Sequence, residues 1–349
     1  MLEVTGQHRE CQEQLRERAR DLLASGEIAA FIGYGSGSLP WVPRPIVVRR
    51  PEEADRLVWN SFLTLNLANY LPGVLKEIEP PRRRGEQVDP STLPRVGIVA
   101  TGCWSRNIVI QIQENQLDRS RVHIIGISSR GMISRHSFKQ ALGGKEALKI
   151  VENDHEIEVT LSDGETMVLS RWDYVRPNCK TCIHPGPVVS DETIGPPPGR
   201  RLVDERFREI EEVEAKEPQG RWEWFEEAFK DCIRCYACRN ACPLCYCPTC
   251  FVDDSRPQWV GKSIETPDTL TFHILRAFHC AGRCTDCGAC ESVCPVGIPM
   301  RLLTKKLIKE AKMLFDWEPG MSLEEAPLLG SFSPNDPDIA ILKGGEKGT

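Results

Sequence analysis

The hydrophobic pattern of the first half of the chain predicts an α/β arrangement. Residues 8–24 carry apolar side chains at helical spacing, so we expect an amphipathic helix there. The runs RVGIVA (95–100) and VHIIGI (122–127) are almost continuously apolar, which is typical of buried parallel strands. The segment that separates them is long enough for a crossover helix. An α/β domain follows from this pattern.

Three further segments extend the predicted domain. The run AAFIGYG is a short apolar strand that leads into a glycine-rich turn, and residues 53–78 have the apolar content of a second helix. Two alternating runs in 157–170 flank Asp163-Gly164 and predict a β-hairpin. The segment IGPPPGR (194–200) cannot form a helix or a central strand, so we place a domain boundary there.

The pattern becomes helical after this boundary. We expect helices over 204–217, 266–279 and 297–315, and the last of these is strongly amphipathic. Beyond residue 318 periodic apolar positions are scarce, which predicts a tail that lies on a partner or stays mobile. The predicted fold is therefore an α/β N-terminal domain (1–195), an α-helical C-terminal domain (200–317) and an extended tail (318–349).

Two cysteine runs dominate the predicted helical domain. They read CIRCYACRNACP and CTDCGACESVCP, and both follow the pattern C-x2-C-x2-C-x3-C-P. In proteins with two 4Fe-4S clusters, this spacing places three ligands on one cluster and the fourth on the other. We therefore predict a helical dicluster ferredoxin. One cluster is assigned to Cys232, Cys235, Cys238 and Cys294, and the other to Cys284, Cys287, Cys290 and Cys242.

Eight of the sixteen cysteines lie outside these runs. Cys11 stands alone in the first helix and is interpreted as a small apolar core residue. The other seven predict at least one more metal centre; they are Cys103, Cys179, Cys182, Cys245, Cys247, Cys250 and Cys280. A third 4Fe-4S cluster is the first expectation, and the alternatives are a structural zinc site and inert thiols.

Composition and charge narrow the class of protein. The net charge of -6 and the lack of a long basic stripe argue against a nucleic-acid-binding protein. The sequence has no run of apolar residues long enough for a membrane span and no secretory signal at its start. So many cysteines without such a signal indicate metal ligands in a reducing cytoplasm rather than disulfides.

The carboxyl ends of the two predicted parallel strands form a second candidate site. Ligands of open α/β sheets bind beyond these ends. The loops that follow the strands carry Cys103 after the first and, after the second, Ser128, Ser129, Arg130 and Gly131. We expect these side chains to share one site.

The sequence around these loops resembles the beta subunits of deazaflavin-reducing hydrogenases and formate dehydrogenases. Two segments carry this resemblance, RVGIVATGCWSRNIVIQIQENQLDRSRVHIIGI and RPNCKTCIHPGPVVSDETIG. A third segment, AGRCTDCGACESVCPVGIP, is similar to the helical dicluster modules of heterodisulfide-reductase-type complexes. The resemblance implies FAD at the loops 101–106 (with Gly102) and 128–133. It also implies a cluster shared by Cys103, Cys179 and Cys182.

These patterns lead to two hypotheses of function. In the first, the chain is an electron-transfer subunit of a cytoplasmic complex with other redox subunits. In the second, it is a self-contained FAD-dependent oxidoreductase that reduces a soluble carrier. Hydrogen, formate, reduced ferredoxin, NADH and a methylene-folate carrier all stay open as terminal donor or acceptor.

Overall fold

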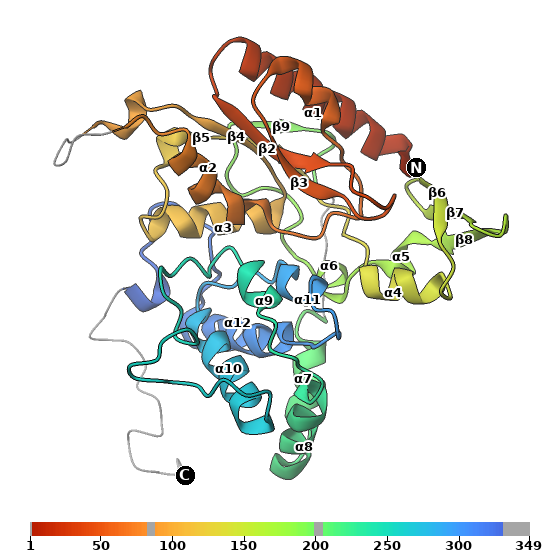
Figure 1. Cartoon of the computed structure of the whole chain (residues 1–349). Coiled ribbons are helices and arrows are strands. Elements are labelled where there is room, and N and C mark those ends of the chain that lie inside the picture. Colours follow the sequence, from red (N-terminus) through yellow and green to blue (C-terminus); the bar gives the residue numbers. More distant parts are fainter. Residues whose placement is uncertain (1, 82–87, 199–204, 331–349) are drawn as a thin grey trace.

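The computed structural model describes residues 2–81, 88–198 and 205–330. Its upper part contains two sheets with their helices, and its lower part is formed by helices and loops that follow residue 205 (Figure 1). The mixed α/β content that the sequence predicts is confirmed. The boundary predicted at 194–200 and the tail after 330 fall partly or wholly outside the described residues.

A five-stranded sheet in the order β3-β2-β4-β5-β9 forms the centre of the first part. Its strands are β2 (Ala30–Gly35), β3 (Arg44–Val48), β4 (Val96–Ala100), β5 (Val122–Ile127) and β9 (Glu192–Ile194). All neighbours are parallel except β2 and β3, and Ile98 of β4 pairs with Ile32 on one side and Ile124 on the other. Every residue of β2, β4 and β5 is buried, as expected for strands covered on both faces.

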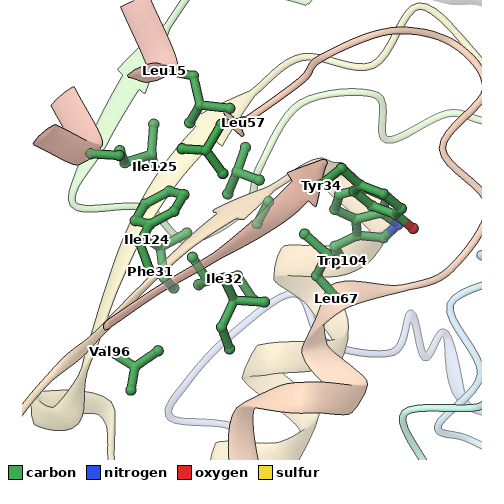
Figure 2. Packing of buried hydrophobic residues seen from close by; sticks show 14 of the residues in the cluster. Leu15, Phe31, Ile32, Tyr34, Leu57, Leu67, Val96, Trp104, Ile124 and Ile125 are labelled. Atoms are coloured by element: carbon green, nitrogen blue, oxygen red, sulfur yellow. The ribbon is translucent and has the colours of Figure 1, made fainter. Parts of the chain in front are cut away.

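Helices cover both faces of this sheet (Figure 1). Helix α1 (Gly6–Ala24) contacts one side of the sheet, and α2 (Leu71–Glu77) and α3 (Gly102–Gln113) lie below it in the view shown. Leu15 of α1 packs toward Phe31 and Leu57, whereas Trp104 of α3 packs beside Tyr34 (Figure 2). The predicted first helix and the predicted crossover helix are both present.

The helix predicted over 53–78 is largely wrong. The segment contains the 3-10 helices η1 (Pro51–Arg56) and η2 (Leu67–Tyr70), and only Leu71–Glu77 is an α-helix. The side chains of Asn60 and Asn66 accept hydrogen bonds from the backbone N–H groups of Phe62 and Ala68. Such local bonds compete with a helix, and they hold the apolar residues in a buried, irregular loop.

A second sheet of four strands lies beside the first, in the order β1-β6-β7-β8. It comprises β1 (Leu2–Val4), β6 (Ala147–Glu152), β7 (Glu156–Leu161) and β8 (Thr166–Ser170), and the predicted hairpin forms β7 and β8. The short helix α5 (Arg171–Tyr174) contacts β7 and β8, and two other short helices of the first part are α4 (Arg135–Ala141) and α6 (Pro177–Lys180). The 3-10 turns η3 (Pro90–Thr92) and η4 (Arg119–Arg121) precede β4 and β5 and contact each other.

The residues from 205 to 330 form helices joined by loops, without a strand in this described stretch. These helices are α7 (Arg208–Glu214), α8 (Pro218–Phe229), α9 (Ala237–Asn240), α10 (Thr266–His279), α11 (Ala289–Ser292), α12 (Arg301–Phe315) and the 3-10 turn η5 (Leu328–Gly330). Helix α10 has the predicted bounds, and Glu265 occupies its N-cap. Within the described ranges, no helix has the length and apolar character that a bilayer crossing requires.

The start of the predicted tail contacts the chain's own α3. The Arg106 Nε donates to the Pro319 carbonyl (2.8 Å), and the Gln113 Nε2 donates to the carbonyls of Ser322 and Glu325 (both 2.8 Å). Glu318 accepts from Arg106 (2.7 Å) and Arg206 (2.8 Å). Residues 318–325 are therefore held against the α/β part by polar contacts.

Candidate metal centres

The two cysteine runs adopt the same backbone conformation. In the first run the residues on either side of Cys235 have left-handed backbones, Arg234 with φ 49° and Tyr236 with φ 58°. In the second run the residues on either side of Cys287 do the same, Asp286 with φ 55° and Gly288 with φ 70°. Non-glycine residues adopt this region at a cost of about 1 kcal/mol or more, so three of them at equivalent positions indicate a functional loop.

This conformation turns backbone N–H groups toward the cysteine sulfurs. In each run the donor lies two residues after the first cysteine. The N–H of Arg234 donates to Cys232, and the N–H of Asp286 donates to Cys284. The Ile298 N–H lies 3.3 Å from the Cys294 Sγ and donates to it. Hydrogen bonds of this kind stabilise thiolates and raise the reduction potential of iron–sulfur clusters.

The sulfurs fall into groups that cross the two runs. The charge of Cys294 acts on Cys232 and Cys238, so the last cysteine of the second run lies with the first run. Conversely, Cys242 acts on the three leading cysteines of the second run, Cys284, Cys287 and Cys290. These four line one small cavity beside Asn107 and Arg276. We refer to Cys232, Cys235, Cys238 and Cys294 as group 1 and to Cys242, Cys284, Cys287 and Cys290 as group 2.

The two groups differ in their exposure. In group 2 burial raises the pKa of Cys284 to about 11, and it also raises the pKa values of Cys287 and Cys290. In group 1 Cys235 is exposed and the neighbouring Ile233 side chain is 53% exposed. Group 1 therefore reaches the surface at Cys235, whereas all four cysteines of group 2 are partly buried.

A third group contains Cys103, Cys179 and Cys182. Cys103 follows β4 at the start of α3, and the other two lie in and after α6. They line one pocket, and burial, together with the charges of Cys182 and Cys179, raises the pKa of Cys103 to about 12. Gly102 makes this approach possible, since a Cβ there would lie 1.9 Å from the His184 carbonyl oxygen. Cys103, Cys179 and Cys182, which the resemblance assigns to one cluster, therefore lie in one pocket.

Hydrogen bonds join this third group to group 2. The Thr285 hydroxyl donates to the Cys103 carbonyl (3.2 Å), and the Asn107 Nδ2 donates both to that carbonyl (2.8 Å) and to Thr285 Oγ1 (2.5 Å). The Asn178 Nδ2 donates to the Asp286 carbonyl (2.8 Å). Cys287 and Cys103 are close enough that their charges interact. Group 2 therefore lies between the third group and group 1.

The four other predicted metal ligands do not form a group of their own. Cys245 and Cys280 lie beside Cys242, and hydrogen bonds from their thiols lower the pKa of Cys242 well below its usual value. Cys250 packs near Phe229 and Phe272, and Cys247 is exposed. Within the described ranges, none of these four joins two other His, Cys, Asp or Glu side chains in a group that could hold a single metal ion. Cys11 is buried in the first core, as expected.

The predicted flavin residues divide between two pockets. Ser128, Ser129 and Arg130 line a cavity of about 570 Å³ at the carboxyl end of β5, together with polar residues of α1 and α5. Gly102 and Gly131 instead line the pocket of the third cysteine group, which Ser129 also borders. The two pockets are therefore neighbours that share one wall.

A buried charge network beneath this cavity gave no signal in the sequence. Glu152 of β6 is fully buried and binds His8 (3.4 Å), Arg171 (3.0 Å) and the Ser61 N–H (3.0 Å). Burial alone would raise the pKa of Glu152, but the charges of His8 and Arg171 and these hydrogen bonds lower it to about 2. Arg171 also donates to the carbonyls of Arg130 (3.1 Å) and Gly131 (2.7 Å), so the network holds the loop after β5.

Comparisons with known proteins match only parts of the chain. A family model for a 4Fe-4S dicluster domain matches residues 227–298, which include both cysteine runs. The F420-dependent formate dehydrogenase subunit beta of Methanocaldococcus jannaschii is 31% identical over 106 residues, 30% of this chain and 27% of that protein. The F420-dependent formate dehydrogenase 1 subunit beta of Methanococcus maripaludis is 27% identical over 112 residues, 32% of this chain and 28% of that protein.

The matches to these two relatives therefore span less than a third of their length. Among solved structures, a chain of the F420-reducing [NiFe] hydrogenase complex from Methanosarcina barkeri aligns with a TM-score of 0.40 at 17% identity, covering 64% of this chain and 89% of that one. The family model by itself supports the prediction of an iron–sulfur module in the C-terminal part.

Proposed function

We propose that the chain is an iron–sulfur electron-transfer subunit of a redox complex with several subunits. The observation that carries this proposal is the crossing of the two cysteine runs, in which each run completes the other's group. Eight thiolates in this arrangement suit two 4Fe-4S clusters, one in group 1 and one in group 2. When bound, such clusters accept and release single electrons at potentials that the surrounding protein sets.

The third cysteine group extends the proposed route into the α/β part. Cys103, Cys179 and Cys182 suit three corners of a further 4Fe-4S cluster, with a zinc site as the alternative. The hydrogen bonds of Thr285 and Asn107 to the Cys103 carbonyl connect this group to group 2. We therefore order the sites as third group, group 2 and group 1, with the exposed surface around Cys235 as the exit toward another subunit.

The names of the similar proteins indicate the kind of complex. Both curated relatives are beta subunits of F420-dependent formate dehydrogenases. We propose that this chain serves a formate dehydrogenase, a hydrogenase or a heterodisulfide-reductase-like complex in the same manner. The alternative is a self-contained flavin enzyme, which the cavity lined by Ser128, Ser129 and Arg130 favours because it borders the third cysteine group.

Pairs of cysteine variants test the crossed assignment. We expect Cys294→Ser to remove the same electron paramagnetic resonance signal as Cys232→Ser, and Cys242→Ser to remove the signal that Cys284→Ser removes. The measurement uses the full chain, purified without oxygen and reduced with dithionite. If Cys294→Ser and Cys284→Ser removed the same signal, the crossed arrangement would be refuted.

The same preparation gives the number of clusters and the flavin content. Three clusters correspond to about 12 irons per chain and two to about 8, with an equal amount of acid-labile sulfide. We expect Cys103→Ser to reduce the higher number to the lower. Flavin in the acid extract, in equal amount to the chain, would favour the self-contained enzyme; its absence from a fully loaded preparation would rule that enzyme out.

A further inference from the structure

Arg276 occupies a position between the two cysteine groups of the dicluster module. It lies on α10, and only 4% of its surface is exposed. Its Nη2 donates to the carbonyl of Cys238 in group 1 (3.1 Å). The same side chain lines the cavity of group 2 with Cys242, Cys284 and Cys290. One guanidinium group is thus in contact with the surroundings of both groups.

The charge of Arg276 is not offset by a carboxylate. Among the residues that the structure describes, no Asp or Glu forms an ion pair with it, and its buried Nε has no hydrogen-bond partner. Arg301 on the adjacent α12 is equally buried but binds Glu209 (2.9 Å), Glu291 (3.0 Å) and Asp286 (3.2 Å). A buried cation without a counter-charge is strongly unfavourable, so a negative group must stand near Arg276 in the functional state.

The surrounding sulfurs supply that negative charge. Burial by itself lowers the pKa of Arg276, but the charged forms of the cysteines around it, Cys290, Cys242, Cys280 and Cys238, raise it well above its usual value. Cys290 and Cys242 belong to group 2 and Cys238 to group 1. The arginine is therefore bound to the negative charge that both groups carry when their cysteines are ligands.

We propose that Arg276 is a counter-cation shared by the two clusters, a positioning residue that raises the reduction potentials of both. This inference rests on the proposed function, since it requires clusters in groups 1 and 2. Each reduction adds one negative charge to a cluster, and a fixed cation in a water-poor environment favours the reduced state. Because the arginine raises both reduction potentials, it prevents a large difference between them, and electron transfer between the two clusters does not become strongly unfavourable.

His273, one turn earlier on the same helix, provides a matched comparison. Its Nε2 lies 3.2 Å from the Cys232 Sγ, and its ring packs against Phe229 and Phe272. Cys232 belongs to group 1, so the hydrogen bond of His273 acts on group 1. Substitution of His273 is therefore expected to change one potential, whereas substitution of Arg276 is expected to change two.

The test is a redox titration of the full chain with its clusters, monitored by electron paramagnetic resonance. We expect Arg276→Gln to shift both potentials to more negative values, with the larger shift in group 2, and Arg276→Lys to stay close to the wild type. His273→Phe is expected to shift only the group 1 potential. Arg208→Gln serves as a control, because Arg208 lies on α7 and pairs with Glu212 (3.1 Å) at the exposed surface.

The possible outcomes separate this inference from the proposed function. Arg276→Gln with full iron content and unchanged potentials would overturn the counter-cation role. Loss of clusters in both Arg276→Gln and Arg276→Lys would also overturn it, because shape rather than charge would then be essential. Loss in Arg276→Gln alone would support it. A wild-type chain that binds no iron would instead refute the proposed function, before any variant is compared.

Discussion

Buried charges in this protein are of two kinds, and the distinction is made by single residues. Glu152 is enclosed by cations and hydrogen-bond donors, and Arg301 is enclosed by three carboxylates. Arg276 is equally buried but faces cysteine sulfurs. A buried charge is tolerated only with a partner, so the kind of partner indicates the role of the residue. Glu152 and Arg301 pair with charged side chains and stabilise the fold, whereas Arg276 faces the sulfurs of the proposed clusters.

Neutralising Glu152 is expected to destabilise the second sheet. In Glu152→Gln, Arg171 stays buried without its counter-charge, which typically costs 3–5 kcal/mol. Hydrogen–deuterium exchange of β6, β7 and β8 at pH 7 should accelerate by about two orders of magnitude or more, since 1.4 kcal/mol corresponds to about tenfold. The matched control is Glu158→Gln on the exposed side of β7; equal exchange in both variants would refute the role of the network.

The pKa of Glu152 fixes the pH range of this contribution. Its value of about 2 in the folded chain lies below the ordinary value of 4.5. The unfolded chain therefore takes up the proton first as the pH falls. The stabilisation by the carboxylate is complete above the ordinary value and is lost progressively as the pH falls toward 2. The difference in stability between the wild type and Glu152→Gln is therefore expected to shrink as the pH falls from 4.5 toward 2, which acid denaturation followed by circular dichroism measures.

At the scale of elements, α3 connects the sheet to the cysteine-rich module. Its Ile108 packs in the core around the sheet, whereas its buried Asn107 and Gln111 bond to residues of the cysteine-rich module. The Gln111 Nε2 donates to the Pro243 carbonyl (2.8 Å), and the cap residue Glu114 binds Arg283 Nη2 (2.7 Å). The run IVIQI alternates like a strand in sequence, but it forms this helix because both of its faces have buried partners.

The first residue of α3 is a sensitive position. A Cβ at Gly102 would lie 1.9 Å from the His184 carbonyl oxygen, so the backbone beside Cys182 would have to move. We expect Gly102→Ala to lower the thermal midpoint, at a cost of roughly 1–3 kcal/mol, and to reduce the iron content. Gly220→Ala in α8 is the control, because its Cβ would meet only an ordinary contact at 3.7 Å and should stabilise the helix. Equal behaviour of the two variants would contradict this expectation.

At the scale of the whole molecule, the three cysteine groups form a line from the α/β part through the module to its surface. This line depends on contacts between distant parts of the chain, such as Thr285 with Cys103 and Asn178 with Asp286. Glu318, in the segment just after α12, contacts residues that line the pocket of the third group, among them Arg106 and Arg206.

Removing the charge of Glu318 is expected to release this segment. Its two arginine partners lower the pKa of Glu318, together with His184 and against the effect of burial, so it is ionised at neutral pH. Glu318→Gln should therefore increase protease cleavage within 318–330 and the reactivity of Cys182 toward alkylating agents. The exposed Glu324→Gln is the control. Unchanged cleavage in Glu318→Gln would show that the backbone contacts of Arg106 and Gln113 suffice.

The sequence by itself determined the local features of this protein. Continuous apolar runs predicted β4 and β5, Asp163-Gly164 predicted the turn between β7 and β8, and the cysteine spacing predicted two crossed ligand sets. Each of these signals lies within a few residues, because strand burial, turn geometry and cluster wrapping are properties of short segments. The loop at 53–70 was missed because side-chain bonds of Asn60 and Asn66 replaced the helix that its apolar content predicted.

Only the tertiary structure decided how these features lie relative to one another. It placed the third cysteine group beside group 2, separated Cys247 and Cys250 from Cys245 and Cys280, and set Arg276 between groups 1 and 2. An arginine in an amphipathic helix carries no local sign that it will be buried without a carboxylate. Its surroundings come from chain segments far apart in sequence, and the packing of α3 and α10 against the cysteine runs alone brings them together.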